Sequence, residues 1–165
     1  MYSDKSITKY LDDLAAKKPA PGGGSSAALA GAMAAAIICM VLNYTIGKKK
    51  YKSFEPAAKN LLKKAQASMR KLIKLFDADI KSYGNVVKAR ENKVLKRALK
   101  EAMAVPLEVA RESAFLTKMC PVVKRRANKD LACDVDVARY LLAAAINSAN
   151  VNVAINRKAL KKVKV

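Results

Sequence analysis

PAPGGGSSAALAGAMAAAIICMVLNYTIGKKKY, residues 19–51, is the stretch that decides how this chain folds. It joins a loop rich in proline and glycine, a helix made mostly of alanine, and three consecutive lysines. Proline fixes its own φ and disfavours helix before it, whereas glycine lets the backbone turn sharply and approach another surface. Ser25 or Ser26 can cap a helix that begins at once. The free N–H groups and the dipole at that helix start favour a carboxylate or phosphate nearby.

The alanine-rich helix is expected to run from Ser25 to about Thr45, with Gly47 as its C-terminal stop. Its small side chains let neighbouring backbones come close, which favours a central helix or a subunit interface. The stretch from Ser25 to Ile46 is also long enough to cross a bilayer. Because Ala, Gly and Ser are only weakly hydrophobic, we expect a buried central helix and no membrane span.

Apolar residues recur at helical spacing through the rest of the chain, and no stretch shows the period-two alternation of a strand. We therefore expect an all-α protein, a single domain over residues 1–165 built as a bundle of about five helices. Pro106 is expected to kink or interrupt the fourth helix, and Pro121 to stop or bend it. The expected helices are 3–17, 25–45, 55–87, one beginning at 91–94, and 131–155, followed by a basic tail at 157–164 that is expected to fray.

The amino-acid composition limits both the partners that the protein can attract and the residues that can transfer protons. Thirty-three Lys and Arg against 13 Asp and Glu give a net charge of +20, which predicts attraction to polyanions. Nucleic acid is one such partner, although the chain has no zinc-finger spacing and no aromatic RNP-like motif; a lysine-rich surface explains the charge equally well. Histidine is absent, so acid–base chemistry must come from Asp, Glu, Lys, Tyr or Cys.

The cysteines, Cys39, Cys120 and Cys133, show no metal-binding or disulfide spacing. We therefore expect no metal site. The charged, amphipathic N-terminus does not read as a signal peptide, and scattered single cysteines fit a reducing cytoplasm.

Two aspartates lie in unusual places. Asp134 shares the expected core-facing stripe of the last helix with Ala138 and Leu141, and it lies in the first turn, where the helix dipole favours a carboxylate. Burial would push its pKa the other way, so it is a candidate general acid–base, or simply a capping residue. Asp79 could orient a ligand or pair with a lysine, and Asn43 could bind a ligand or satisfy backbone groups.

Several of these segments together resemble the cyclodeaminase/cyclohydrolase family of folate enzymes. They are Pro-Ala-Pro-Gly-Gly-Gly-Ser (19–25), Gly-Lys-Lys-Lys-Tyr (47–51), Asp79 with Tyr83, Ala-Val-Pro-Leu (104–107), Asp134-Val135 with Val137-Ala138, and Asn-Val-Asn-Val-Ala-Ile-Asn (150–156). They occur in the order of the family and span nearly the whole chain. This sequence departs from the family pattern at Ala127-Asn128 and at Cys133, and it lacks a Leu-Pro-Lys after the third helix.

The resemblance implies an all-helical homodimer or larger assembly, with a folate pocket near the subunit interface and Asp134 as the proton-transfer group. It implies that Pro21, Gly22, Gly23, Gly24 and Ser25 line the pocket with Asn43, Tyr51 and Asp79. It also implies that Lys48, Lys49 and Lys50 meet the anionic glutamate tail of folate. We accordingly expect Asp134, Asn43 and the 22–25 loop to surround one cleft.

The activity implied is formiminotetrahydrofolate cyclodeaminase or 5,10-methenyltetrahydrofolate cyclohydrolase, with a separate formiminotransferase as a possible partner. Neither reaction needs a metal or a redox cofactor, and one aspartate suffices for the proton transfers. The competing hypotheses are a basic helical protein that binds nucleic acid or another polyanion, and an inactive structural or regulatory subunit on the same scaffold.

Overall fold

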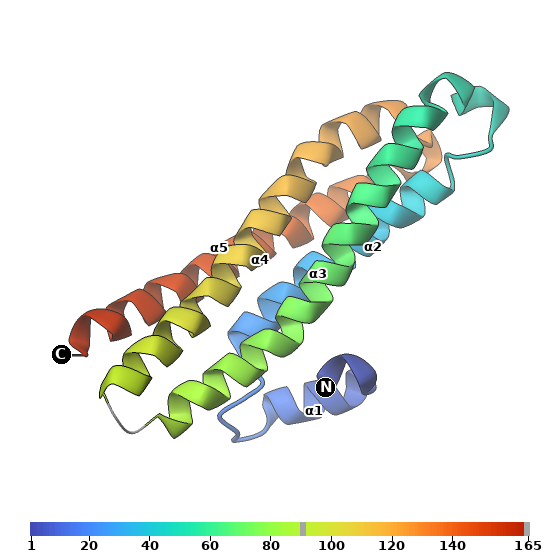
Figure 1. The fold of residues 1–165 in the computed structure, drawn as a ribbon. Helices are drawn as coiled ribbons and strands as arrows, with labels where there is room; N and C mark the ends of the chain where they lie inside the picture. Colours follow the sequence, from blue (N-terminus) through green and yellow to red (C-terminus); the bar gives the residue numbers. More distant parts are fainter. Residues whose placement is uncertain (90–91, 164–165) are drawn as a thin grey trace.

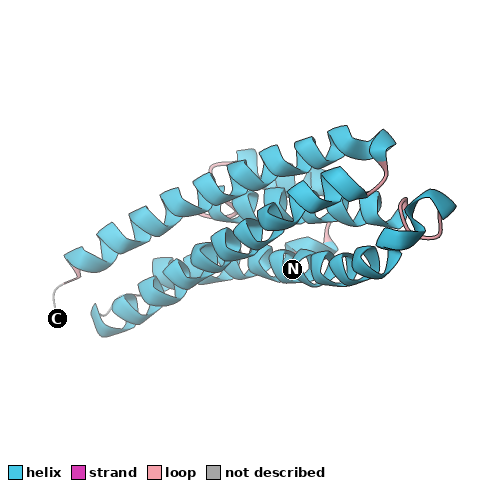
Figure 2. Ribbon diagram, turned by 90° about the horizontal axis from the view of Figure 1, so that it is seen from above, coloured by secondary structure: helices cyan, strands magenta, loops and turns pink. Residues whose placement is uncertain are grey.

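The computed structural model describes residues 1–89 and 92–163, and for residues 92 and 93 it describes the backbone only. Four long helices run alternately up and down in an elongated bundle, and a short helix lies against its side (Figure 1). Seen along a second direction, the described chain consists of helices joined by short loops and contains no strand (Figure 2). The elements are η1 (Tyr2–Asp4), α1 (Ile7–Ala15), α2 (Gly23–Asn43), η2 (Lys49–Phe54), α3 (Glu55–Lys88), α4 (Asn92–Arg126), η3 (Lys129–Leu131) and α5 (Ala132–Lys162). The expectation of an all-α bundle of about five helices is confirmed.

Proline does not interrupt the fourth helix. α4 continues from Asn92 to Arg126 with Pro106 and Pro121 inside it, so the expected interruption at Pro106 and the expected stop at Pro121 are wrong. A proline inside a helix removes one backbone hydrogen bond and costs about 3 kcal/mol. Because α4 packs along both α3 and α5, tertiary burial outweighs that loss, and Pro106 itself is fully buried.

Other helix ends also differ from expectation. The first expected helix is divided into η1 and α1, with Ser6 as the N-cap of α1 through its hydroxyl. α5 runs on to Lys162, so the basic tail is helical over most of its length. Glu91, one expected start of the fourth helix, and Lys164, at the end of the tail, lie outside the described residues.

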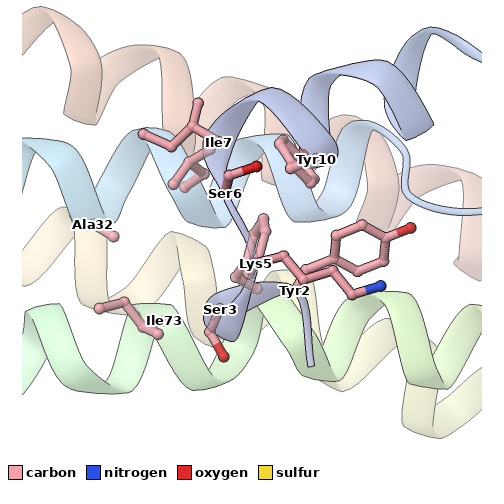
Figure 3. A pocket seen from close by; sticks show the side chains of 10 residues that line it. Tyr2, Ser3, Lys5, Ser6, Ile7, Tyr10, Ala32 and Ile73 are labelled. Atoms are coloured by element: carbon pink, nitrogen blue, oxygen red, sulfur yellow. The ribbon is translucent and has the colours of Figure 1, made fainter.

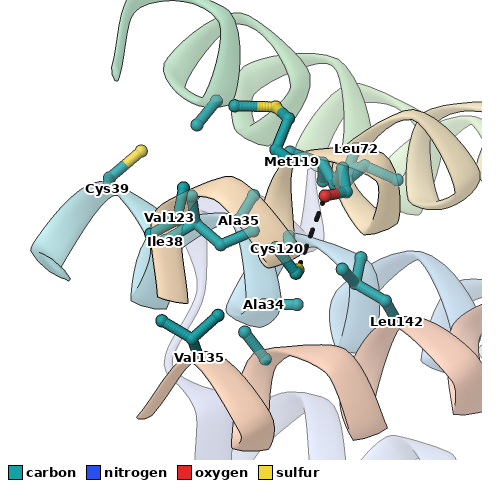
Figure 4. Close-up of a cluster of buried hydrophobic side chains, with 14 of the residues drawn as sticks. Ala34, Ala35, Ile38, Cys39, Leu72, Met119, Cys120, Val123, Val135 and Leu142 are labelled. Carbon is teal, nitrogen blue, oxygen red and sulfur yellow. Dashed lines mark hydrogen bonds between the residues drawn. The ribbon is translucent and has the colours of Figure 1, made fainter. Parts of the chain in front are cut away.

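Alanine makes α2 the central helix. Ala28, Ala34 and Ala35 are completely buried, and their small side chains leave room for the larger ones of Leu72 and Leu142 on α3 and α5 (Figure 4). Close packing of this kind is the main stabilising contribution in a helical bundle. By length and composition alone α2 is also one helix that could cross a membrane, but most of it lies in the core, as expected.

The long helices separate the molecule into two ends (Figure 1). The loop before α2 lies at the end where α3 and α5 finish. The turns at 44–54 and 127–131 lie at the opposite end, where Tyr51 and Thr45 hydrogen-bond across to Asn128 and Lys129. We call these the loop end and the lysine end, after the Gly22–Gly24 loop and Lys48–Lys50.

Candidate functional site

The Gly-rich loop is closed by its own serines. Gly22, rather than Ser25 or Ser26, is the N-cap of α2, so the helix begins two residues earlier than expected. The hydroxyls of Ser25 and Ser26 both donate to the carbonyl oxygen of Gly22, at 2.8 and 3.0 Å. The loop therefore enters the helix in one fixed conformation, with a cis Ala20–Pro21 peptide just before it.

Asp79 on α3 lies directly against this loop. A Cβ atom added to Gly24 would stand only 2.1 Å from a carboxylate oxygen of Asp79, which is closer than any real contact. A side chain at position 24 would therefore displace the Asp79 carboxylate, and glycine lets the carboxylate lie against the loop. The same test at Gly22 finds nothing within 4 Å. Two interpretations were left open for Asp79, a role in orienting a ligand and an ion pair with a lysine. Among the described residues it forms no ion pair with a lysine, and its carboxylate lies at the loop.

A cavity of about 260 Å³ opens between the loop, α3, α4 and α5. Among the described residues that line it, Asp79 is the only Asp, Glu, Lys or Arg, and the polar groups around it are hydroxyls and amides. The lining residues are Pro19, Ala20, Gly22, Gly23, Gly24, Asp79, Ser82, Tyr83, Ala102, Asn152, Ile155 and Asn156.

Burial raises the pKa of the Asp79 carboxyl above its ordinary value, and a hydrogen bond from the backbone N–H of Ser25 partly opposes that rise. A carboxyl in this state holds its proton more strongly than an exposed one, yet has a donor fixed against its ionised form. Those are the properties of a group that can both accept and donate a proton.

The lysine end is built differently. Lys48, Lys49 and Lys50 are exposed, and the ammonium of Lys50 lies 5.6 Å from the centre of the Tyr51 ring. Gly47 adopts the left-handed conformation, with φ of 82°, that ends the turn after α2. The region presents cations to solvent, and it suits an anionic group outside the protein surface.

Asp134 lies at this lysine end, in the first turn of α5, and its side chain is half-buried rather than enclosed. Its neighbour Asp136 forms ion pairs with Lys124 and Arg139, whereas among the described contacts Asp134 meets only the Cys133 thiol, at 4.0 Å. The core stripe of α5 is instead carried by Val135, Ala138 and Leu142.

The expected site residues therefore fall into two groups. Pro21 to Ser25 and Asp79 lie together at the loop end, while Asn43, Lys48 to Tyr51 and Asp134 lie at the lysine end. The 21 residues from Gly23 to Asn43 separate the two groups by about 30 Å at the usual helical rise. Within one chain, they do not surround one cleft.

Sequence reasoning missed part of the cavity. Asn152 and Asn156 belong to the 150–156 motif but were not among the expected site residues, yet both line the cavity, where their side-chain amides donate to the carbonyls of Ser148 and Ala102. The signal was present, because four asparagines at the end of an otherwise apolar helix are unusual. What was lacking was the knowledge that this part of α5 faces the Gly-rich loop.

The protein is thus an antiparallel helical bundle with a carboxylate facing a Gly-rich helix start. Comparison with known proteins identifies the family that has this fold. The family described as formiminotransferase-cyclodeaminase matches residues 6–165. A methenyltetrahydrofolate cyclohydrolase from Methylorubrum extorquens is 36% identical over 97% of this chain and 83% of its own length. The crystal structure of formiminotetrahydrofolate cyclodeaminase from Thermotoga maritima has a TM-score of 0.94 and 34% identity, covering 98% of this chain and 83% of the other.

The chain belongs to the formiminotransferase-cyclodeaminase family. The formimidoyltransferase-cyclodeaminase of Rattus norvegicus is 28% identical over 94% of this chain, but the match spans only 31% of that longer protein. The resemblance deduced from the motifs is thus confirmed at the level of the family.

Proposed function

We propose that this protein is a folate one-carbon enzyme that hydrolyses 5,10-methenyltetrahydrofolate or cyclises 5-formiminotetrahydrofolate with loss of ammonia. Relatives of similar identity carry each of the two names, and one site can serve both reactions. The observation that carries the proposal is the raised-pKa carboxyl of Asp79 in a cavity closed by the Gly-rich loop.

In the hydrolytic reaction, the Asp79 carboxylate takes a proton from a water molecule as the water oxygen attacks the methenyl carbon. The resulting carbinolamine loses its hydroxyl proton to solvent while the bond from carbon to N5 breaks. The protonated Asp79 then returns its proton to N5, which gives 10-formyltetrahydrofolate and one released proton. General acid–base assistance of this kind contributes about 10²- to 10⁴-fold to the rate.

In the deamination, N10 attacks the carbon of the formimino group, whose nitrogen is protonated. Asp79 takes the proton from N10 and gives it to the amino group that was the formimino nitrogen. The bond from carbon to that nitrogen breaks, ammonia leaves, and the methenyl cation remains. Only one carboxyl is needed, because the same proton is accepted and then donated.

This proposal moves the acid–base role from Asp134 to Asp79. Both aspartates are half-buried, but Asp79 is the carboxyl that lines a cavity and whose pKa is raised by desolvation, whereas Asp134 lies at the far end of α2. A cavity of about 260 Å³ is somewhat smaller than the pockets that hold whole drug-sized ligands. It would therefore accept the ring system of folate and leave the glutamate tail outside.

We further propose that the protein is a homodimer. α2 contains no charged residue from 23 to 43, and α5 contains none from 140 to 156, in a chain that is 28% charged. Much of the surface that these two helices leave open is apolar, including Met33, Tyr140, Val151 and Ile155. A long uncharged face on a strongly charged protein is typical of a surface that another protein covers.

A second copy packed antiparallel on this face would unite the two groups of site residues. Met33 lies midway along α2, and a twofold axis near it would place the lysine end of one subunit beside the loop end of its partner. The lysines would then meet a folate tail that leaves the cavity of the other subunit. This arrangement gives the positive charge of Lys48–Lys50 a use at a site about 30 Å away along its own chain.

Free thiols at all three cysteines support a reducing compartment such as the cytoplasm. A separate formiminotransferase would supply the substrate of the deamination.

The experiment that tests the function is a spectrophotometric assay of both reactions side by side on the purified protein. We expect turnover of at least one of the two folates. Absence of turnover with both, in a protein that is folded by circular dichroism, would contradict the proposal and favour the non-catalytic alternatives.

A further inference from the structure

Tyr10 connects the Gly-rich loop to the helix that carries Asp79, and nothing in the sequence marks it for that role. Its ring packs on Phe76 of α3, with ring centres 4.9 Å apart, and Phe76 precedes Asp79 by one helical turn. Its hydroxyl lies 3.1 Å from both the Ser25 and the Ser26 hydroxyls at the start of α2. Tyr10 is only 3% exposed, so these contacts are shielded from water.

The proton inventory of this cluster is fixed. Each serine has one hydroxyl proton, and both serines donate it to the Gly22 carbonyl oxygen. With both serine protons directed to Gly22, the Tyr10 hydroxyl can donate its single proton to one serine oxygen at a time, and the Ser25 oxygen also accepts from the Gly22 backbone N–H. The tyrosine holds both serines in the orientation that closes the loop, and it does so without competing for the Gly22 carbonyl.

Tyr10 belongs to an N-terminal arm, residues 1–18. The arm is joined to α3 through Asp77, which accepts from the backbone N–H groups of Tyr2 and Ser3. Within it, the buried carboxylate of Asp13 accepts from the Tyr2 hydroxyl at 2.8 Å and forms ion pairs with Lys9 and Lys18. Figure 3 shows Tyr2 and Tyr10 side by side where the arm lies over α2 and α3.

We propose that Tyr10 is a positioning residue of the folate site, which holds the Gly22–Ser26 segment at the correct distance from Asp79. The inference rests on the proposed function of that site. Tyr10 touches neither the cavity nor Asp79, so its action is indirect. It braces the same two elements that the Ser25 N–H and the Asp79 carboxyl connect, and loss of its hydroxyl would loosen that connection.

The test compares Tyr10→Phe with Tyr2→Phe. Both variants keep an aromatic ring and lose one hydroxyl from the same arm, but only Tyr10 contacts the loop serines. We expect Tyr10→Phe to lower kcat by about three- to tenfold, the effect of one hydrogen bond. We expect its pH–rate profile to move to higher pH, because a weaker hydrogen bond from Ser25 leaves the Asp79 carboxyl with a higher pKa.

Tyr2→Phe should lose thermal stability but keep the wild-type kcat and pH profile. If the two variants have the same kcat and the same pH profile, the positioning role of Tyr10 is wrong and the hydroxyl is merely structural. Asp79 is the only Asp, Glu, Lys or Arg among the described residues that line the cavity, so a shift of the pH–rate profile reports on the Asp79 carboxyl.

A second measurement does not depend on turnover. Hydrogen exchange followed by NMR at the Ser25 amide should be about tenfold faster in Tyr10→Phe than in wild type, and unchanged in Tyr2→Phe. Equal protection in all three proteins would overturn the inference. A wild-type protein without folate turnover would instead contradict the proposed function, so the two failures are distinguishable.

Discussion

The two ends of α2 carry different kinds of chemistry. At the loop end, one half-buried carboxyl lies in a cavity beside a closed backbone loop, and its pKa is raised by desolvation. At the lysine end, three exposed cations and the half-buried Asp134 lie at or near the surface. We infer from this difference that the loop end transfers protons and that the lysine end attracts an anion, so that the two ends have separate roles. The predictions below test that separation, from the largest expected effect to the smallest.

Gly24→Ala should have the most severe effect. The new methyl group would overlap the Asp79 carboxylate, so the carboxylate must leave its place at the loop, or the loop or α3 must move. We expect a loss of stability of about 1–3 kcal/mol from overpacking and a loss of more than 100-fold in turnover. Gly22→Ala is the matched control for folding, because its methyl group meets nothing within 4 Å. Thermal melts of the two variants check the difference, and equal melting temperatures would show that Asp79 does not lie against Gly24.

Mixed dimers test whether the two ends work together across subunits. Asp79→Asn and a triple charge reversal of Lys48, Lys49 and Lys50 to Glu should each give poorly active homodimers. After subunit exchange at equal amounts, half of the dimers would be mixed, and each mixed dimer would hold one intact site of two. We expect about a quarter of the wild-type activity to return. No recovery despite proven exchange would mean that each cleft draws all its groups from one subunit.

Removing charge at the lysine end should weaken binding rather than chemistry. For Lys48→Ala with Lys49→Ala, we expect KM to rise about three- to tenfold with a polyglutamylated folate, since exposed charge contacts contribute up to about 1 kcal/mol each. kcat should stay within about twofold. Added salt should raise the wild-type KM toward that of the variant. Lys63→Ala with Lys64→Ala, exposed on α3, is the control, and an equal rise in that variant would show that only net charge matters.

The smallest effect concerns stability and pH. The folded state binds the Asp79 proton more tightly than the unfolded state, so this group lowers the stability as the pH rises from its ordinary value of 3.8 through its higher folded value. Asp79→Asn removes that contribution. Denaturant unfolding should therefore show the variant gaining stability relative to wild type as the pH rises above about 4. A relative loss over the same range would mean that the folded protein favours the ionised carboxylate.

The sequence was sufficient for the loop, the alanine helix and the turn at Gly47, because each depends on local chemistry. Proline and glycine limit the backbone, alanine allows close packing, and a glycine stops a helix. The interruption expected at Pro106 failed because packing against two neighbouring helices outweighs a local preference.

The site was harder to predict because it depends on contacts between distant segments. Asp79 and Gly24 are 55 positions apart, and no local pattern reveals that they touch. The helical periodicity of the apolar residues predicted that Asp134 lies on the inner face of its helix, and its side chain is half-buried. The periodicity could not show that the first turn of α5 lies at the end of the bundle, where the neighbouring helices cover it only in part.

The most direct test of the account is a parallel assay of Asp79→Asn and Asp134→Asn under saturating folate, with both reactions measured. Each substitution removes one carboxyl and keeps its shape, so the two variants differ only in which end of the bundle loses its charge. The account predicts that Asp79→Asn loses at least about 100-fold in kcat and that Asp134→Asn stays within about threefold of wild type. The reverse result, an active Asp79→Asn and an inactive Asp134→Asn, would contradict the assignment of proton transfer to the loop end.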